Sequence, residues 1–265
     1  MEKKVVLYAI HGFLGRPDDW DFLEEAAGKS CQLIKVDVLK ECPPSKYRSL
    51  EGWAASFNQR VEKETPKKYH RGIMGYSMGG RMALHALVAP KSPWNSAMIL
   101  SSNLGLPEDA GDVRADRIQK DSDWARRFLN DPWNEVCAAW NNQAIFGGKP
   151  APKDRQESEF DKKELAAALN YWTLGKQADL LEPFRAKIKT WALGHVPLFW
   201  GVGELDEKYV EQARQLTKKI ELKSRIFPGA YHRFPWDEKE AFLGFFNDYL
   251  LHILFNFQVP GIETS

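Results

Sequence analysis

The chain alternates between short apolar runs and longer segments in which apolar residues recur every three or four positions. Continuous apolar runs of this length, rich in β-branched residues, are typical of strands that are covered on both faces. We therefore predict strands at Val5 to Ile10, Gln32 to Val38, Gly72 to Met74, Ala97 to Leu100, Pro197 to Val202 and Ser224 to Phe227.

The segments between these runs have the spacing of amphipathic helices. Leu50 to Glu64 is the clearest, because Trp53, Phe57 and Val61 fall on one helical face. Further helices are predicted from about Pro17, from Ser77 to about Ala89, and from about Asp237 to Phe255. Alternating strands and helices predict an α/β fold with a mostly parallel central sheet flanked by helices on both faces.

The alternation stops between residues 103 and 189. Four helical segments are predicted there, at Val113 to Leu129, Pro132 to Phe146, Phe160 to Trp172 and Gln177 to Ala186. We interpret 103–189 as a helical lid inserted over the sheet, which leaves 1–102 and 190–265 as the α/β core.

Composition narrows the function classes. The 265 residues carry 37 Lys and Arg against 36 Asp and Glu, a net charge of +1, so no global field favours nucleic acid or an anionic membrane. The three cysteines lack metal-ligand spacing, and no apolar run is long enough to span a bilayer. We expect a soluble cytoplasmic protein that acts on a small molecule. A monomer is expected, although the sequence carries no signal of oligomeric state.

The motif that carries most chemistry is the G-x-S-x-G pattern from Gly75 to Gly79. It follows an apolar run and opens a predicted helix, which is the context of a nucleophile elbow. Ser77 would then stand on a sharp strand-to-helix turn, and the flanking glycines would provide the room that the turn needs. Serine is a weak nucleophile and a weak base alone, so the motif requires partners elsewhere in the chain.

Two residues that follow predicted strands can supply those partners. Asp206 comes after the strand at 197–202 and His232 after the strand at 224–227, which gives the order Ser77, Asp206, His232 of an α/β-hydrolase triad. His232 would take the serine proton, and Asp206 would orient the imidazole. Glu204 is the alternative acid. The other histidines, which we interpret as structural, are His11, His70, His85, His195 and His252.

The loop after the first strand completes the predicted site. Backbone N–H groups of Phe13 and Met78 are placed to form an oxyanion hole, one after the strand and one after the serine. His11 is interpreted as a hydrogen-bonding residue of that turn.

Four segments resemble a known family. They are HGFLGRPDDW, GYSMGGRMALH, SSNLGLPEDAGDVRADRIQKDSDWARRFL and LFWGVGELDEK. Together they are similar to the α/β-hydrolase family's menaquinone-pathway lyase, 2-succinyl-6-hydroxy-2,4-cyclohexadiene-1-carboxylate (SHCHC) synthase, over nearly the whole chain. The resemblance implies a cofactor-free elimination of pyruvate from a 5-enolpyruvyl cyclohexene carboxylate, with the activated serine as the base.

The resemblance also implies substrate contacts. These would be Tyr76, Arg81, Arg117, Trp140 and Gln143. Arginine pairs bidentately with carboxylates, which suits a polycarboxylate substrate. Simpler roles remain open: Arg81 as a surface helix residue, Arg117 on a solvated helix, and Trp140 as an anchor of the lid.

Two stretches near the expected mouth of the site depart from the family pattern. Val38 to Cys42 replaces a proline-glycine-histidine-glycine type of loop, and Tyr231 to Pro235 replaces a Gly-His loop. They bear on the substrate more than on the triad. Two alternative functions stay open: a carboxylesterase or thioesterase with Ser77 as a covalent nucleophile, and a ligand-binding protein without turnover.

Overall fold

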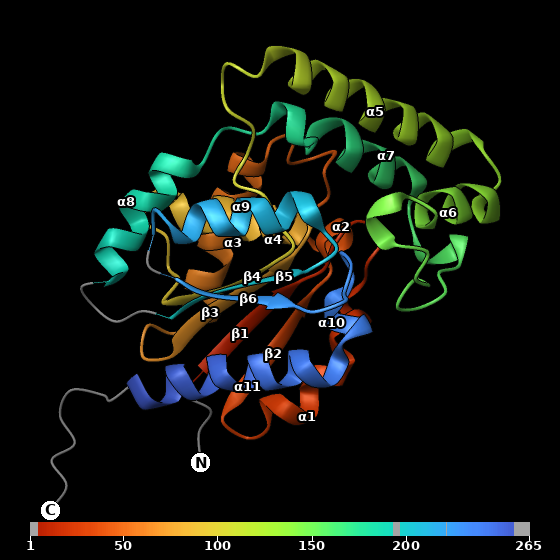
Figure 1. The fold of residues 1–265 in the computed structure, drawn as a ribbon. Helices are drawn as coiled ribbons and strands as arrows, with labels where there is room; N and C mark the ends of the chain where they lie inside the picture. The colour runs from red at the N-terminus through yellow and green to blue at the C-terminus, as the bar shows by residue number, and fades with distance from the viewer. Residues whose placement is uncertain (1–4, 193–196, 221, 257–265) are drawn as a thin grey trace, which may run out of the picture.

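The computed structural model describes residues 5–192, 197–220 and 222–256, and a six-stranded sheet forms its centre (Figure 1). The strands lie in the order β2-β1-β3-β4-β5-β6, and every neighbouring pair is parallel. The strands are β1 (Val5–Ile10), β2 (Cys31–Val36), β3 (His70–Tyr76), β4 (Ser96–Leu100), β5 (Leu198–Gly203) and β6 (Lys223–Phe227). The predicted α/β fold with a parallel sheet is confirmed.

Helices cover both faces of this sheet, as Figure 1 shows. One face packs against α3 (Leu50–Glu64), α4 (Met78–Val88), α8 (Leu181–Ala192) and α9 (Glu207–Thr217). The other packs against η1 (Pro17–Leu23), α1 (Glu24–Ala27), α10 (Phe234–Asp237) and α11 (Lys239–Asn256). Each face therefore has its own apolar core.

The strand β1 explains why the apolar runs of this sequence do not alternate with polar residues. Successive side chains of a strand point to opposite faces of the sheet. The even-numbered residues of β1 pack into the core beneath α3 and α4, and the odd-numbered residues pack into the core beside α11. All six are buried, so every position has to be apolar.

The strand order places a crevice at one end of the sheet. From β1 the chain goes first to β2 on one side and then to β3 on the other, so the order reverses between β1 and β3. In open parallel sheets, ligands bind beyond the carboxyl ends of the strands at such a switch point. Residues 11–15 and Ser77 follow these two strands.

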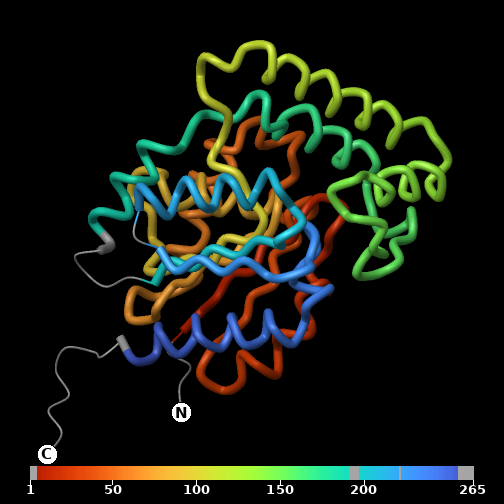
Figure 2. Tube along the Cα trace, in the orientation of Figure 1, coloured from red at the N-terminus to blue at the C-terminus, as the bar shows by residue number. Residues whose placement is uncertain are grey.

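A run of helices separates β4 from β5. It comprises α5 (Gly111–Asn130), α6 (Trp133–Asn141), η2 (Ala144–Phe146), η3 (Glu157–Glu159), α7 (Lys162–Tyr171), η4 (Leu174–Lys176) and α8. Figure 2 shows α5, α6 and α7, from yellow-green to green, outside the layer that contains α4, and α5 packs against α7. The helical character of 103–189 matches the prediction, whereas its role as a lid stays a prediction.

The predicted strand Gln32 to Val38 is wrong at its carboxyl end. β2 ends at Val36, and Val38–Glu41 forms the short helix α2. Asp37 begins this helix because its side chain accepts a hydrogen bond from Lys40 N at 3.2 Å. Val38 is buried in the core as a helical residue, so its apolar character was mistaken for the end of a strand.

Two predicted helices of the insertion have different bounds in the structure. The segment Pro132 to Phe146 is divided, since α6 ends at Asn141 and the 3₁₀ turn η2 follows. The helix predicted from Gln177 begins instead at Leu181, where the carboxylate of Asp179 accepts a hydrogen bond from Leu181 N at 2.9 Å.

Two expectations from composition can be compared with the fold. Cys42, which is buried, and Cys137 are free thiols. No helix in the described part of the chain has both the length and the apolar character needed to cross a membrane.

Candidate active site

Ser77 occupies the sharp turn between β3 and α4 that the motif predicts. Its backbone has φ 53° and ψ −113°, a conformation that L-residues rarely adopt. Two hydrogen bonds hold this turn, one at each backbone polar group of the serine. Ser77 N donates to Leu100 O at 2.9 Å, and Ser102 Oγ donates to Ser77 O at 3.0 Å. The neighbouring strand β4 and the residues after it therefore hold the strained serine in place.

The glycines around Ser77 are required by close backbone contacts. A Cβ on Gly75 would lie 2.3 Å from Gly79 O, and a Cβ on Gly79 would lie 2.4 Å from both Ile10 O and His11 O. The elbow thus presses against the end of β1, and only glycine permits this approach.

His232 and Asp206 reach Ser77 in one chain of hydrogen bonds. His232 Nδ1 and Asp206 Oδ2 are 2.5 Å apart, and His232 Nε2 and Ser77 Oγ are 2.9 Å apart. Since Nδ1–H donates to the carboxylate, Nε2 accepts from the serine hydroxyl. His232 and Asp206 are 3% and 4% exposed, so solvent hardly competes for these contacts.

The loops that carry the acid and the histidine are fastened to each other. Glu204 N donates to Phe227 O and Leu205 N donates to Ala230 O, each at 2.9 Å. Glu204, the alternative acid, is exposed and its carboxylate accepts from Gly229 N at 2.8 Å. The structure therefore brings Asp206, and not Glu204, to His232.

The loop after β1 lies against the serine, where an oxyanion hole would have to be. A Cβ on Gly12 would lie 2.9 Å from the Tyr76 ring and 3.4 Å from Ser77 Cβ, so glycine brings the backbone of this loop close to Ser77. Phe13 follows directly, and Met78 begins α4. The donor roles of these two backbone N–H groups stay predictions.

His11 is a structural residue of that turn, as predicted. Its Nε2 accepts from Val38 N at 3.3 Å, so its Nδ1 carries the proton that is donated to Gly12 O at 2.8 Å. Burial lowers the pKa of His11, which keeps the ring neutral. His70 and His85 are buried in contacts away from the triad, and His195 lies outside the described residues.

A cavity of about 370 Å³ opens beside Ser77 and His232. Two of the predicted substrate contacts line it, namely Tyr76 and Trp140. Tyr76 packs edge-on against Trp236 with ring centroids 4.8 Å apart, and Trp140 packs on Phe13 at 4.6 Å. The insertion thus contributes aromatic side chains to the wall of the site.

The other three predicted contacts lie outside the wall of this cavity. Arg81 is 9% exposed and donates to Trp172 O at 2.7 Å and Gln177 Oε1 at 3.1 Å, so it is not a surface residue. Arg117 forms an ion pair with Asp121 at 2.8 Å. Gln143 Nε2 donates to the carbonyl of Trp140 at 3.0 Å. Their roles toward substrate stay predictions.

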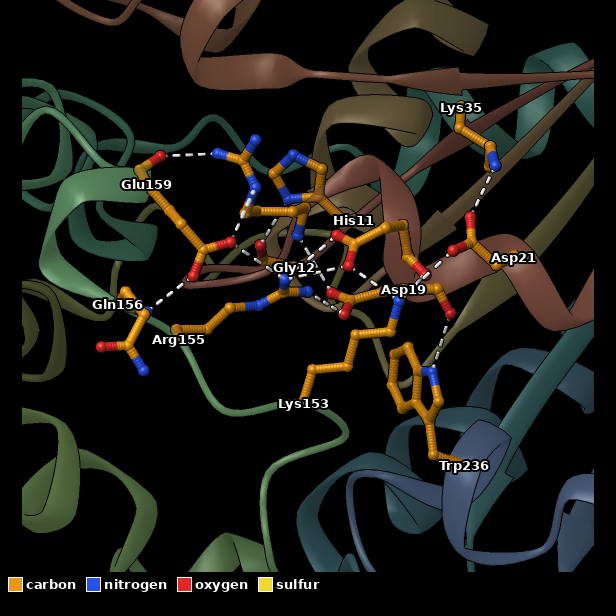
Figure 3. A network of polar contacts seen from close by, with 12 residues as sticks. His11, Gly12, Asp19, Asp21, Lys35, Lys153, Arg155, Gln156, Glu159 and Trp236 are labelled. Atoms are coloured by element: carbon orange, nitrogen blue, oxygen red, sulfur yellow. Dashed lines mark hydrogen bonds and ion pairs between the residues drawn. The ribbon is translucent and has the colours of Figure 1, made fainter.

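Three cations on the wall were not singled out in the sequence: Lys153, Arg155 and Arg233. Figure 3 shows Lys153 and Arg155 directed at carboxylates that follow β1. Arg155 pairs with Asp18 at 3.0 Å and also with Asp19, and Lys153 pairs with Asp18 at 2.7 Å. Arg155 and Asp19 are both nearly buried. These contacts join segments more than 130 residues apart, and no local sequence pattern predicts them.

The described residues contain no group of three His, Cys, Asp or Glu side chains arranged to hold a metal ion. Whether the chain acts without a cofactor stays an expectation. The chemistry that the visible groups offer is proton transfer or nucleophilic attack by a serine paired with a buried histidine.

The sheet, the strained serine turn and the Ser77–His232–Asp206 hydrogen bonds define the α/β-hydrolase fold class. A MenH from Staphylococcus aureus has the same fold with a TM-score of 0.77 at 18% identity, covering 97% of this chain and 96% of that one. An esterase from Exiguobacterium antarcticum has a TM-score of 0.65 at 16% identity, covering 95% of this chain and 93% of that one.

Among curated proteins, the chain is similar to 2-succinyl-6-hydroxy-2,4-cyclohexadiene-1-carboxylate synthases. Those of Yersinia pseudotuberculosis (strain YPIII) and Yersinia enterocolitica (strain 8081) are each 28% identical over 85% of this chain and 81% of their own length. No family model matches the chain. The predicted resemblance to this synthase family is confirmed.

Proposed function

We propose that this chain is a lyase that eliminates pyruvate from 2-succinyl-5-enolpyruvyl-6-hydroxy-3-cyclohexene-1-carboxylate to form SHCHC in menaquinone biosynthesis. The similarity to SHCHC synthases along 85% of the chain supports the reaction. The observation that carries the mechanism is the continuous hydrogen-bonded chain from Asp206 through His232 to Ser77.

In this mechanism Ser77 acts as a base. His232 Nε2 takes the hydroxyl proton, and Asp206 stabilises the imidazolium that forms. The serine oxygen then removes the proton on ring carbon C2, and the C–H electron pair forms a C2–C3 double bond. The C3–C4 double bond shifts to C4–C5, and the C5–O bond to the enolpyruvyl group breaks. The imidazolium holds the proton that the departing enolpyruvate needs, so the triad returns to its starting state. No bond forms between Ser77 and the substrate.

The substrate of this reaction carries several carboxylates, and cations near the triad suit it. Burial is the main cause that lowers the pKa of the Arg81 guanidinium to about 10, and the positive charge of Arg117 is the second cause. The two cations therefore repel each other. We include Arg81, Arg117 and Gln143 as substrate contacts, together with Tyr76 and Trp140 on the cavity wall. A carboxylate between the arginines would relieve their repulsion.

We further propose that residues 103–189 work as a lid and that the backbone N–H groups of Phe13 and Met78 stabilise developing negative charge. Trp140 and Phe146 of the insertion already line the cavity beside Ser77. A wall of this kind would exclude water while the ring proton is removed.

The alternative with the same three residues is a carboxylesterase or thioesterase in which Ser77 forms an acyl-enzyme. The two functions are separated by measuring pyruvate release from the enolpyruvyl substrate and p-nitrophenyl acetate hydrolysis in the same preparation. The lyase proposal predicts rapid pyruvate release and feeble ester cleavage, and the reverse pattern would establish the esterase. A binding protein without turnover would show neither, and would fail to react with a fluorophosphonate at Ser77.

A further inference from the structure

Arg233 is a buried cation on the wall of the cavity that contains Ser77 and His232. It follows His232 directly and is the N-cap residue of the short helix α10. Only 6% of its surface is exposed, and it lies within Tyr231 to Pro235, one of the two stretches that depart from the family pattern. Its position is therefore fixed by the same backbone that positions the histidine.

Among the described residues, the guanidinium of Arg233 has its hydrogen bonds and its ring contact with uncharged groups of the insertion. Its central carbon lies 3.8 Å from the centre of the Phe146 ring, a cation–π contact. Nη1 donates to Lys149 O at 3.2 Å, and Nη2 donates to Asn141 Oδ1. A guanidinium has five N–H groups, so these two hydrogen bonds leave donors for a further partner.

No carboxylate among the described residues lies within ion-pair distance of Arg233. Asp237 and Asp19 act on it only from farther away, and burial lowers its pKa. A buried cation without an anion at contact distance is costly, because it has lost water and has no ion-pair partner in its place. Arg155, on the same wall, differs in having two aspartates beside it.

We propose that Arg233 binds a carboxylate group of the substrate in the cavity beside Ser77 and His232. The inference rests on the proposed function for the identity of the substrate, but the site itself requires only a small carboxylate. An anion here supplies the charge that Arg233 lacks. It also holds the remainder of the substrate against Ser77 and the aromatic wall formed by Tyr76 and Trp236.

Binding of succinate, a simple dicarboxylate, tests the site without relying on turnover. Titration calorimetry is carried out on wild type, Arg233→Met, Arg233→Lys and Arg185→Met. Arg185 is the matched control, since it pairs with Glu182 on α8 and lies outside the cavity wall. We expect Arg233→Met to weaken succinate binding about 10- to 100-fold, as the loss of a charge-assisted hydrogen bond does. The succinate affinity of Arg233→Lys should lie between those of wild type and Arg233→Met. The affinity of Arg185→Met should match that of wild type.

Three results would overturn the inference: wild type that does not bind succinate, Arg233→Met within about twofold of wild type, or Arg233→Lys as weak as Arg233→Met. If Arg233→Met does not fold, succinate binding by Arg233→Lys alone tests the inference. A merely structural role would lower the Tm and leave succinate affinity of the folded protein unchanged.

Kinetics then separate this inference from the proposed function. With the enolpyruvyl substrate, Arg233→Met should raise KM about 10-fold or more and change kcat less. Pyruvate release with an unchanged KM would remove the carboxylate role and leave the lyase standing. Arg233-dependent succinate binding without any pyruvate release would do the opposite.

Discussion

At the scale of single residues, Asp206 contacts the imidazole of His232 and its neighbour Glu204 does not. Asp206 Oδ2 lies 2.5 Å from His232 Nδ1, while the carboxylate of Glu204 is engaged by Gly229 N. An aspartate in this position fixes the tautomer in which Nε2 can accept the serine proton. An asparagine could hydrogen-bond to the ring but would favour the wrong tautomer.

We therefore expect Asp206→Asn to lower kcat for pyruvate release about 10²- to 10⁴-fold, the range of general acid–base effects. Glu204→Gln, two residues earlier in the same loop, is the matched control and should stay within about threefold of wild type. The measurement is initial-rate kinetics of both variants beside wild type. Equal losses in the two variants would show that the loop, and not the aspartate, matters.

The close approach of Gly79 to β1 predicts a second single-residue effect. Gly79→Ala forces a Cβ against two carbonyl oxygens, and we expect the free energy of unfolding to fall by about 1–3 kcal/mol, as overpacking does. Gly111→Ala is the control, since nothing lies within 4 Å of its added Cβ and alanine favours the helix α5. Urea unfolding of both variants measures the difference. A Gly79→Ala protein as stable as wild type would contradict the close packing of the elbow.

His85 on α4 gives a pH dependence. Burial, and then the charge of Arg81, lowers the pKa of His85 to about 3. Glu51 lies 3.4 Å away but is exposed, so burial dominates. An unfolded histidine titrates near pH ~6.5. As the pH falls, His85 therefore binds a proton in the unfolded chain before it does so in the folded chain. The stabilisation that this difference gives the folded chain is complete above about pH 6.5 and is lost as the pH falls toward 3.

Between pH 7 and pH 5, protonation of His85 in the unfolded chain should lower the unfolding free energy of the wild type by up to about 2 kcal/mol. His85→Leu cannot take up the proton, so its unfolding free energy should fall less over the same interval. Urea unfolding at both pH values measures the two slopes. Identical slopes would mean that His85 is protonated equally in the folded and unfolded chains.

At the scale of elements, the loop between η2 and η3 is attached to the start of η1 through charges (Figure 3). Burial raises the pKa of the Asp19 carboxyl, and the charge of Arg155 opposes that effect. The pair thus depends on both partners being present. Lys153 in the same loop binds Asp18 and Asp21 at the surface, where water screens the charges.

Arg155→Met should lower the unfolding free energy by about 3 kcal/mol, because it leaves the Asp19 carboxylate buried without its cation. Lys153→Met, the control in the same loop, should cost less than about 1 kcal/mol. Urea unfolding of the two variants measures these losses. Hydrogen exchange of residues 151–159 should rise more in Arg155→Met, and equal exchange in the two variants would count against the attachment.

At the scale of the whole molecule, residues differ in how much of their structure the sequence could predict. The strand β1 could be predicted because burial on both faces makes every residue apolar. The 15-residue helix α3 could be predicted because burial of one face repeats apolar residues every three or four positions. The contacts among Ser77, Asp206 and His232 could be predicted because each residue follows a strand in a fixed order, while their catalytic roles stay predictions. Val38 was misread because a buried helical valine looks like a strand residue.

The contacts of the cations on the cavity wall could not be predicted from the sequence. Arg233 meets Asn141 from 92 residues away, and Arg155 meets Asp19 from 136 residues away. Such contacts follow from how the insertion packs on the core, and no spacing within the sequence encodes them. Arg81 shows the same point, since its buried contacts with Trp172 and Gln177 became visible only in the folded chain.

The most direct test of the whole account is pyruvate release by wild type and Ser77→Ala, with the spontaneous elimination subtracted. The geometry at Ser77 predicts rapid release by the wild type and a loss of at least about 10²-fold in the variant, with both proteins unfolding at the same urea concentration. Release at the background rate by the wild type, or equal rates in a folded Ser77→Ala protein, would contradict the account.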